Sequence, residues 1–155
     1  MIKKVTFGAG CFWHVQDEFS KLDGVINTTV GYIGGTLKNP TYKQVCSHKT
    51  GHAEVTLVEY DPKKISFKKL LETFWSIHDP TQLNRQGPDL GDQYRSAIFY
   101  YDEEQKKEAE ASLKKKQKEY KQKIVTKIEK AEEFWKAEEY HQNYFKKTGK
   151  RVCGF

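Results

Sequence analysis

The spacing of apolar residues predicts a helix close to the start of the chain. Phe12, Val15, Phe19 and Leu22 recur at intervals of three and four residues, which places them on one face of a helix. Further helices are expected over residues 67–78, 103–120 and 137–147.

Runs rich in β-branched and aromatic residues, or alternating in polarity, predict the strands. The alternation over residues 52–60 places Glu54 on the face of its strand opposite Ala53 and Val55. Strands are expected over residues 5–7, 25–32, 52–60, 94–101 and 125–128, with long loops over 34–51 and 79–92.

The order of these elements predicts the fold class. Through residue 101 it reads strand, helix, strand, strand, helix, strand, which is the split βαβ pattern of a ferredoxin-like, two-layer α+β sandwich. Extra C-terminal helices and a flexible tail over residues 148–155 are expected to follow. A length of 155 residues fits one domain over residues 1–155.

Charge and cysteine content narrow the class of protein. The net charge is +6, but the lysines of residues 103–123 alternate with glutamates, which is typical of a solvated helix face rather than a nucleic-acid surface. Three cysteines do not resemble a secreted disulfide scaffold. The chain shows no apolar run of a signal peptide or membrane span. We therefore expect a cytoplasmic protein without membrane contact.

Cys11 stands where the first strand gives way to the first helix. The unpaired amide groups at a helix N-terminus favour a thiolate. Gly8 and Gly10 allow a tight turn that leaves the sulfur accessible. Position alone is equally compatible with a reactive thiol and with a small buried residue that only fills space.

A family resemblance decides between these alternatives. Gly10-Cys11-Phe12-Trp13 closely resembles the signature of the A-type peptide methionine sulfoxide reductases. Four later blocks are similar to that family in the same order, and the resemblance covers nearly the whole chain. These blocks are residues 39–47 (NPTYKQVCS), 50–55 (TGHAEV), 84–96 (NRQGPDLGDQYRS) and 137–144 (AEEYHQNY).

The resemblance implies a reaction and its residues. Cys11 would attack the sulfoxide sulfur and become a sulfenic acid. Glu54, protonated through burial, would donate to the sulfoxide oxygen. The remaining implied residues are Tyr42 and Tyr94 at the oxygen, Phe12 and Trp13 as a wall for the methyl group, Asp89 at the substrate backbone or a water molecule, and His52, Glu138 and His141 as support.

The resemblance also implies how the enzyme is regenerated. Cys153 would form a disulfide with Cys11, which thioredoxin, or dithiothreitol in the test tube, would reduce. No metal and no other cofactor is implied. The expected substrates are oxidised proteins and free methionine-S-sulfoxide, the R epimer being a poor substrate. Cys46 is given a structural role, and a monomer is expected.

The sequence departs from the family pattern in three places. His14 stands where the family usually has glycine, and Gln16 where it usually has an acidic residue. His14 could tune the site or lie in solvent. The tail holds one cysteine, Cys153, where many members have two, so a two-step disulfide relay is not expected.

Three rival classes of function agree less well with the sequence. A nucleic-acid module would need aromatic partners beside the lysines of residues 103–123, which that stretch lacks. A thiol peroxidase would consume peroxide rapidly and reduce sulfoxide poorly. A metal site would have to use Cys11, Cys46, His48, His52 and Cys153, which lack the pair spacing typical of zinc ligands.

Overall fold

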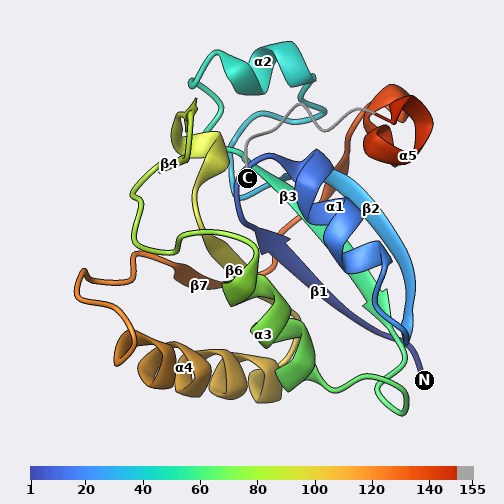
Figure 1. Cartoon of the computed structure of the whole chain (residues 1–155). Helices are drawn as coiled ribbons and strands as arrows, with labels where there is room; N and C mark the ends of the chain where they lie inside the picture. The colour runs from blue at the N-terminus through green and yellow to red at the C-terminus, as the bar shows by residue number, and fades with distance from the viewer. Residues whose placement is uncertain (150–155) are drawn as a thin grey trace.

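The chain forms a six-stranded sheet with the order β7-β6-β1-β3-β2-β8 (Figure 1). A computed structural model describes residues 1–149. The strands are β1 (Lys3–Gly8), β2 (Val25–Ile33), β3 (Ala53–Tyr60), β6 (Ala97–Tyr100), β7 (Lys127–Lys130) and β8 (Trp135–Lys136).

The four central strands confirm the ferredoxin-like prediction. β1 pairs antiparallel with both β3 and β6, and β3 pairs antiparallel with β2. Helix α1 (Phe12–Ser20) connects β1 to β2, and α3 (Phe67–Ser76) lies between β3 and β6. β7 adds a parallel strand beside β6, and β8 adds a short antiparallel strand beside β2.

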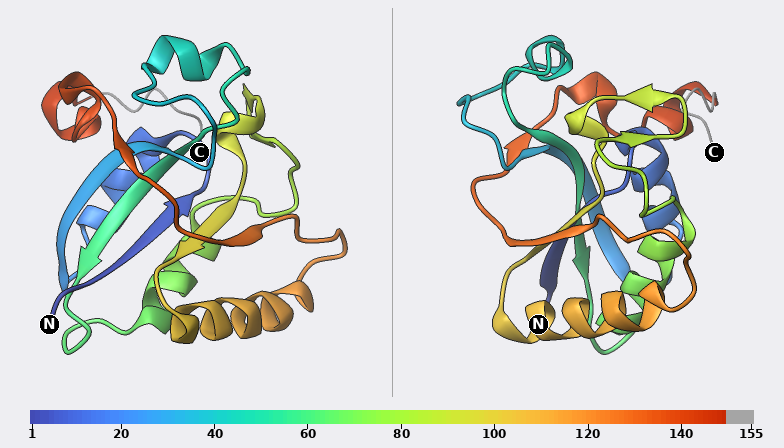
Figure 2. Two further views of the ribbon diagram at one scale, coloured as in Figure 1. Left: turned by 180° about the vertical axis from the view of Figure 1, so that it is seen from behind. Right: turned by 90° about the vertical axis from the view of Figure 1, so that its left-hand side faces the viewer.

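Helices α1 and α3 cover one face of the sheet (Figure 2). Their apolar faces meet at Phe7, whose ring stacks on Phe19 of α1 at 4.8 Å and on Phe74 of α3 at 5.1 Å between centroids. Helix α4 (Glu103–Gln117) joins the same core through Ala109, and its Ser112 accepts a hydrogen bond from Trp75. The lysine-rich stretch is therefore a helix with one buried edge.

The opposite face of the sheet carries a smaller apolar cluster. Ala53 and Val55 pack there, with Phe134 of the segment between β7 and β8 lying against them. This segment crosses the face of the sheet that is turned toward the viewer in the left-hand view of Figure 2. The predicted alternation along β3 is confirmed, because Glu54 faces α1 instead.

The two long loops predicted from the sequence contain short elements. Residues 34–51 include the helix α2 (Tyr42–Cys46), which begins at a capping box: Thr41 accepts from the Gln44 amide, and the Gln44 side chain accepts from Thr41. Residues 79–92 include a hairpin of β4 (Arg85–Gln86) and β5 (Asp89–Leu90), and the 3-10 turn η1 (Asp92–Tyr94) follows. Strand β6 consequently begins at Ala97, later than predicted.

The prediction of one helix over residues 137–147 is wrong in extent. The 3-10 turn η2 (Glu139–His141) and the helix α5 (Tyr144–Thr148) are separated by Asn143, whose φ of 53° ends regular helix. The expected tail lies outside the described residues from position 150 onward, and with it Cys153. Among residues 1–149 no helix is long and apolar enough to cross a membrane.

Candidate active site

Cys11 is the N-cap residue of α1, directly after the turn that leaves β1. Its carbonyl oxygen accepts the first amide bonds of the helix, from His14 and Val15. Gly10 has a φ of 92°, and a Cβ atom there would lie 2.9 Å from Gln86 Cγ of β4. Glycine is therefore required before Cys11 for two reasons, the backbone angle and the close approach of Gln86.

Glu54 projects from β3 to the same end of α1. Its side chain is fully buried, and its Oε1 accepts a hydrogen bond from the Phe12 amide at 3.3 Å. Burial raises the pKa of Glu54 to about 8, although the Phe12 amide opposes this; the charge of Asp89 raises it further. The carboxyl group is thus mainly protonated at neutral pH. Because Oε1 accepts from Phe12, the proton belongs on Oε2, which has no hydrogen-bond partner among residues 1–149.

Tyr42 and Tyr94 bring two phenols to this carboxyl group. Tyr42 is the first residue of α2, and Tyr94 is the last residue of η1. Burial raises the pKa of both hydroxyls above the usual range, and Glu54 raises both further. Both groups are therefore neutral hydrogen-bond donors at any physiological pH.

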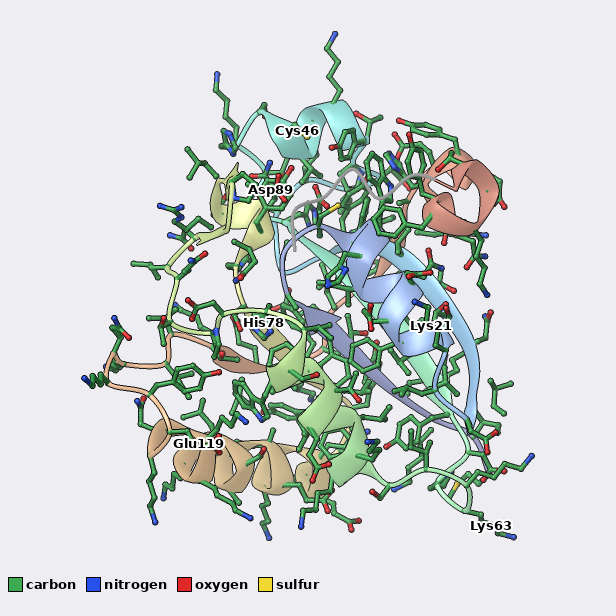
Figure 3. All side chains as sticks on the ribbon, viewed as in Figure 1. Lys21, Cys46, Lys63, His78, Asp89 and Glu119 are labelled. Carbon is green, nitrogen blue, oxygen red and sulfur yellow. The ribbon has the colours of Figure 1, made fainter. Side chains whose placement is uncertain are left out.

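Asp89 lies on β5 at the same end of the molecule. Partial burial raises its own pKa, and its charge raises the pKa of both Glu54 and Tyr94. Figure 3 shows Asp89 and Cys46 at this end, far from Lys63 and Glu119 at the other end.

Aromatic rings surround the start of α1. Phe12 is fully buried, with its ring 6.3 Å from Tyr42 and 5.2 Å from His141 between centroids. Trp13 is partly buried, and its indole stacks on Tyr144 of α5 at 3.9 Å. One face of Trp13 is thus covered by a second ring. Sequence reasoning missed Tyr144, which follows His141 at helical spacing.

His141 is held by Trp13. The indole N–H of Trp13 donates to His141 Nδ1 at 2.9 Å. Since an indole nitrogen can only donate, Nδ1 must be unprotonated and Nε2 must carry the proton. Burial lowers the pKa of His141, against the opposing charge of Glu138. Its Nε2 is buried and has no partner within the described part of the chain.

The side chain of Glu138 forms hydrogen bonds with both β2 and α2. Its Oε1 accepts from the Tyr32 hydroxyl and its Oε2 from the Tyr42 amide, both at 3.0 Å. Partial burial alone would raise its pKa, but these hydrogen bonds outweigh burial and the pKa is lowered. The pKa values of two carboxyl groups near Tyr42 are therefore shifted in opposite directions. Glu54 favours the protonated acid, and Glu138 favours the carboxylate. The long-range pairing with Tyr32 gives no local sequence signal.

His52 contacts a loop rather than the aromatic cluster. Its Nδ1 accepts from the Gly35 amide at 3.0 Å, so its Nε2 donates to the Leu37 carbonyl at 2.7 Å. His52 thereby fixes the chain that leads into α2.

Cys46 lies beside Tyr42 and Gln93. It follows Tyr42 by one helical turn on α2, and its thiol interacts with the side chains of Tyr42 and Gln93. Burial raises the pKa of the thiol against these two interactions, and the charge of Glu54 raises it further. The sequence pattern did not indicate Gln93 as a residue of the site.

His14 does not lie in solvent. It is 8% exposed, and its Nε2 lies 3.3 Å from the carbonyl oxygen of Ile77, at the C-terminal end of α3. Among residues 1–149 no group of three or more His, Cys, Asp or Glu side chains is arranged to hold a metal ion.

A cysteine at a helix N-terminus, beside a buried protonated carboxyl group and two phenols, is an arrangement typical of cysteine-dependent enzymes. A family model described as peptide methionine sulfoxide reductase matches residues 3–155, and the chain belongs to this family.

Individual relatives agree with this assignment. The peptide methionine sulfoxide reductase MsrA of Methanothermobacter thermautotrophicus is 55% identical over 153 residues, covering 97% of this chain and 90% of that protein. The crystal structure of reduced Mxr1 from Saccharomyces cerevisiae superposes with a TM-score of 0.94 at 38% identity, covering 98% of this chain and 88% of that chain. Mxr1 in complex with Trx2 superposes with a TM-score of 0.67 at 28% identity, covering 92% and 84%.

Proposed function

We propose that this chain reduces methionine-S-sulfoxide, free or in oxidised proteins, to methionine. The observation that carries the proposal is the buried Glu54 carboxyl group, protonated at neutral pH and bonded to the amide of the residue after Cys11. Sulfoxide reduction needs a thiolate and an acid at one place, and this arrangement supplies both.

Cys11 is the nucleophile of the proposed reaction. The thiolate, favoured by the amide groups at the start of α1, attacks the electrophilic sulfur. Glu54 Oε2 donates its proton to the sulfoxide oxygen as the sulfur–oxygen bond breaks. The hydroxyl group so formed passes to Cys11 Sγ, which becomes a sulfenic acid, while the bond between Sγ and the methionine sulfur breaks and methionine leaves with its sulfur reduced. Cys11 is oxidised by two electrons, which balances the reduction of the sulfoxide.

The other side chains orient the substrate. Tyr42 and Tyr94 donate hydrogen bonds to the oxygen beside Glu54, and Phe12 and Trp13 receive the methyl group. Separate sites for the oxygen and the methyl group accept only one epimer in the correct orientation, and the family resemblance implies that this is the S form. Asp89 and the Nε2–H of His141 serve the peptide backbone of the substrate as acceptor and donor, and Glu138 holds Tyr42 in place.

Regeneration uses Cys153, which lies outside the described residues. Its thiol attacks the sulfenic acid, water leaves, and a Cys11–Cys153 disulfide forms, which thioredoxin or dithiothreitol reduces. The relative Mxr1 has been crystallised with Trx2, which supports thioredoxin as the reductant. The enzyme acts as a cytoplasmic monomer and needs neither a metal nor another cofactor.

The test is reduction of separate S and R epimers of methionine sulfoxide. Wild type, Cys11→Ser and Cys153→Ser are assayed with dithiothreitol and with thioredoxin. We expect S-selective turnover that disappears in Cys11→Ser, while Cys153→Ser fails only with thioredoxin. Absence of turnover with both epimers would reject the function, and peroxide consumption would then test the peroxidase alternative.

A further inference from the structure

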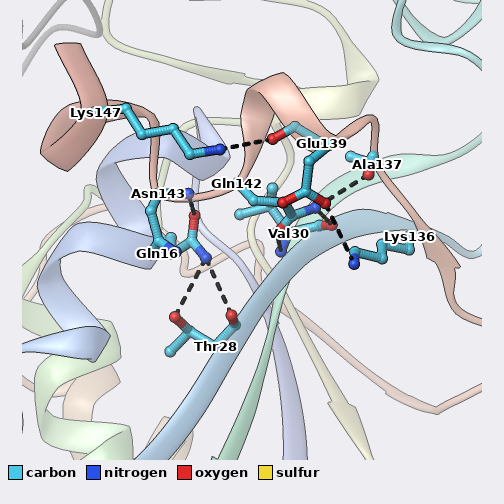
Figure 4. Close-up of polar contacts among 9 residues, drawn as sticks. All are labelled: Gln16, Thr28, Val30, Lys136, Ala137, Glu139, Gln142, Asn143 and Lys147. Atoms are coloured by element: carbon cyan, nitrogen blue, oxygen red, sulfur yellow. Dashed lines mark hydrogen bonds and ion pairs between the residues drawn. The ribbon is translucent and has the colours of Figure 1, made fainter.

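Side-chain amides complete the outer edge of β2. Strand β8 pairs with this edge at Gly31 and Tyr32, and the amide of Ala137, directly after β8, donates to the Val30 carbonyl at 3.0 Å. Beside it, the Gln142 side chain accepts from the Val30 amide at 3.0 Å and donates to the Val30 carbonyl at 3.0 Å (Figure 4). It also donates to the Ala137 carbonyl at 3.1 Å. Gln142 thus supplies the acceptor for the Val30 amide and a second donor, beside the Ala137 amide, to the Val30 carbonyl.

Gln16 contacts the same strand at Thr28, two residues before Val30. Its Nε2 donates to the Thr28 carbonyl at 3.1 Å and to the Thr28 hydroxyl at 3.3 Å (Figure 4). Its Oε1 accepts from the Asn143 amide at 2.7 Å. Gln16 projects from α1, so one amide connects the helix that begins at Cys11, the sheet, and the start of α5.

Both glutamines therefore hold one segment, residues 137–143, against β2. This segment and the start of α5 bring Glu138, His141 and Tyr144 to the site, where they contact Tyr42 and Trp13. Asn143 lies between His141 and Tyr144, and its left-handed backbone sets the direction of α5. The two amide anchors thus flank the residues that orient Trp13.

The anchors use both functions of the glutamine side chain. A primary amide presents a donor and an acceptor on separate atoms of the same terminus, and both side chains use both functions. Gln142 is 6% exposed and Gln16 is 1% exposed, so water cannot replace a lost partner cheaply. A carboxylate at either position could accept but could not donate to the strand carbonyl.

We propose that Gln16 and Gln142 are positioning residues for the substrate pocket: they act through residues 137–144 to orient Trp13 and His141, and so determine the KM for the sulfoxide. The proposal rests on the function proposed above, in which Trp13 and His141 contact the substrate. According to this proposal, both glutamines affect substrate binding indirectly, without contacting the substrate.

Gln142→Glu is the test, because it keeps shape and removes the two donated bonds. Gln105→Glu is its matched control. Gln105 is also buried, accepts from the Tyr101 amide, and donates to the Lys4 carbonyl and the Tyr60 hydroxyl, all on the far side of the core. If Gln142→Glu does not fold, Gln16→Met takes its place, because it keeps the length of the side chain and removes its hydrogen bonds to Thr28 and Asn143.

We expect Gln142→Glu to raise the KM for S-sulfoxide about tenfold while kcat changes less than twofold. Gln105→Glu should lower the urea midpoint to a similar degree and leave KM within twofold. Equal KM values in the two variants would overturn the proposal.

A second readout does not depend on activity. The Trp13 indole proton, assigned by NMR with Trp13→Phe, should exchange with solvent at least tenfold faster in Gln142→Glu and at the wild-type rate in Gln105→Glu. If wild type reduces no sulfoxide but this difference is seen, the proposed function fails and the anchoring of Trp13 stands. An unchanged exchange rate in Gln142→Glu rejects the anchoring itself.

Discussion

The Phe12 amide donates a hydrogen bond to the Glu54 carboxyl group at 3.3 Å, across 42 residues of sequence. The residue after Cys11 therefore contacts the proposed acid, and this hydrogen bond connects the start of α1 to β3. The amide alone would favour the carboxylate, but burial is the larger effect and raises the pKa of Glu54 to about 8. The same helix end can thus support a thiolate and a neutral carboxyl group.

The first prediction concerns the pH dependence of activity. Glu54 must be protonated to donate, so kcat/KM of the wild type should fall as the pH rises through about 8. Glu54→Gln keeps the acceptor for Phe12 but has no acidic proton, and should lose about 10²–10⁴-fold in kcat at pH 7. It should also lack the alkaline decline assigned to Glu54. A variant that keeps a tenth or more of wild-type kcat would show that another group supplies the proton.

The second prediction concerns stability. Glu54 holds its proton up to about pH 8 in the folded chain, against an ordinary pKa of 4.5. Between these values the folded state binds more protons, so the contribution of Glu54 to stability falls as the pH rises. Relative to wild type, Glu54→Gln should gain about 3–5 kcal/mol in free energy of unfolding between pH 4.5 and 8. Urea denaturation across this range measures the difference, and parallel curves for the two proteins would contradict the burial argument.

The third prediction concerns the aromatic wall. Trp13→Phe removes the indole N–H that fixes the tautomer of His141 and reduces the stacking on Tyr144. We expect the KM for S-sulfoxide to rise about tenfold, with a smaller effect on kcat. Trp75→Phe is the control, because it also loses one indole hydrogen bond, to Ser112, in the distant core. A similar KM in both variants would remove Trp13 from the binding site.

The fourth prediction concerns acid stability and a histidine outside the site. His78 donates to the Phe74 carbonyl and accepts from the Ser96 hydroxyl, and burial lowers its pKa from 6.5 to about 4. The unfolded chain therefore binds the extra proton between these values, and stability is lost as the pH falls from 6.5 toward 4. This costs about 3 kcal/mol in the wild type, and His78→Asn should not show it. Urea denaturation at pH 7 and pH 4.5 tests this; equal losses in both proteins would assign the effect elsewhere.

The sequence predicts the part of the fold that depends on periodicity. Helix α1 and strand β3 show clear spacings, and their order along the chain indicates the ferredoxin-like sheet. Helix α2 has five residues, too few to show a period, although the Thr41–Gln44 capping box marks its start. The hairpin of β4 and β5 has two residues per strand, and alternation cannot be recognised over two residues.

The site could be predicted only where a motif carries it. The resemblance indicates Cys11 and Glu54, and the alternation along β3 shows that Glu54 can face α1. The contacts of Glu138 and His141 span about 100 residues or more, and no local pattern encodes such pairings. Gln16 shows only as a departure from the family pattern, since its partners Thr28 and Asn143 belong to two other segments, one of them 127 residues away.

The covering of the β2 edge has a consequence for the handling of damaged proteins. An open sheet edge pairs with any extended chain through its backbone, and oxidised, partly unfolded proteins are rich in such chains. On β2 this edge is closed by β8 and by the amides of Gln142 and Gln16. The groups of β2 that these contacts occupy are therefore not open to pairing with an extended substrate chain.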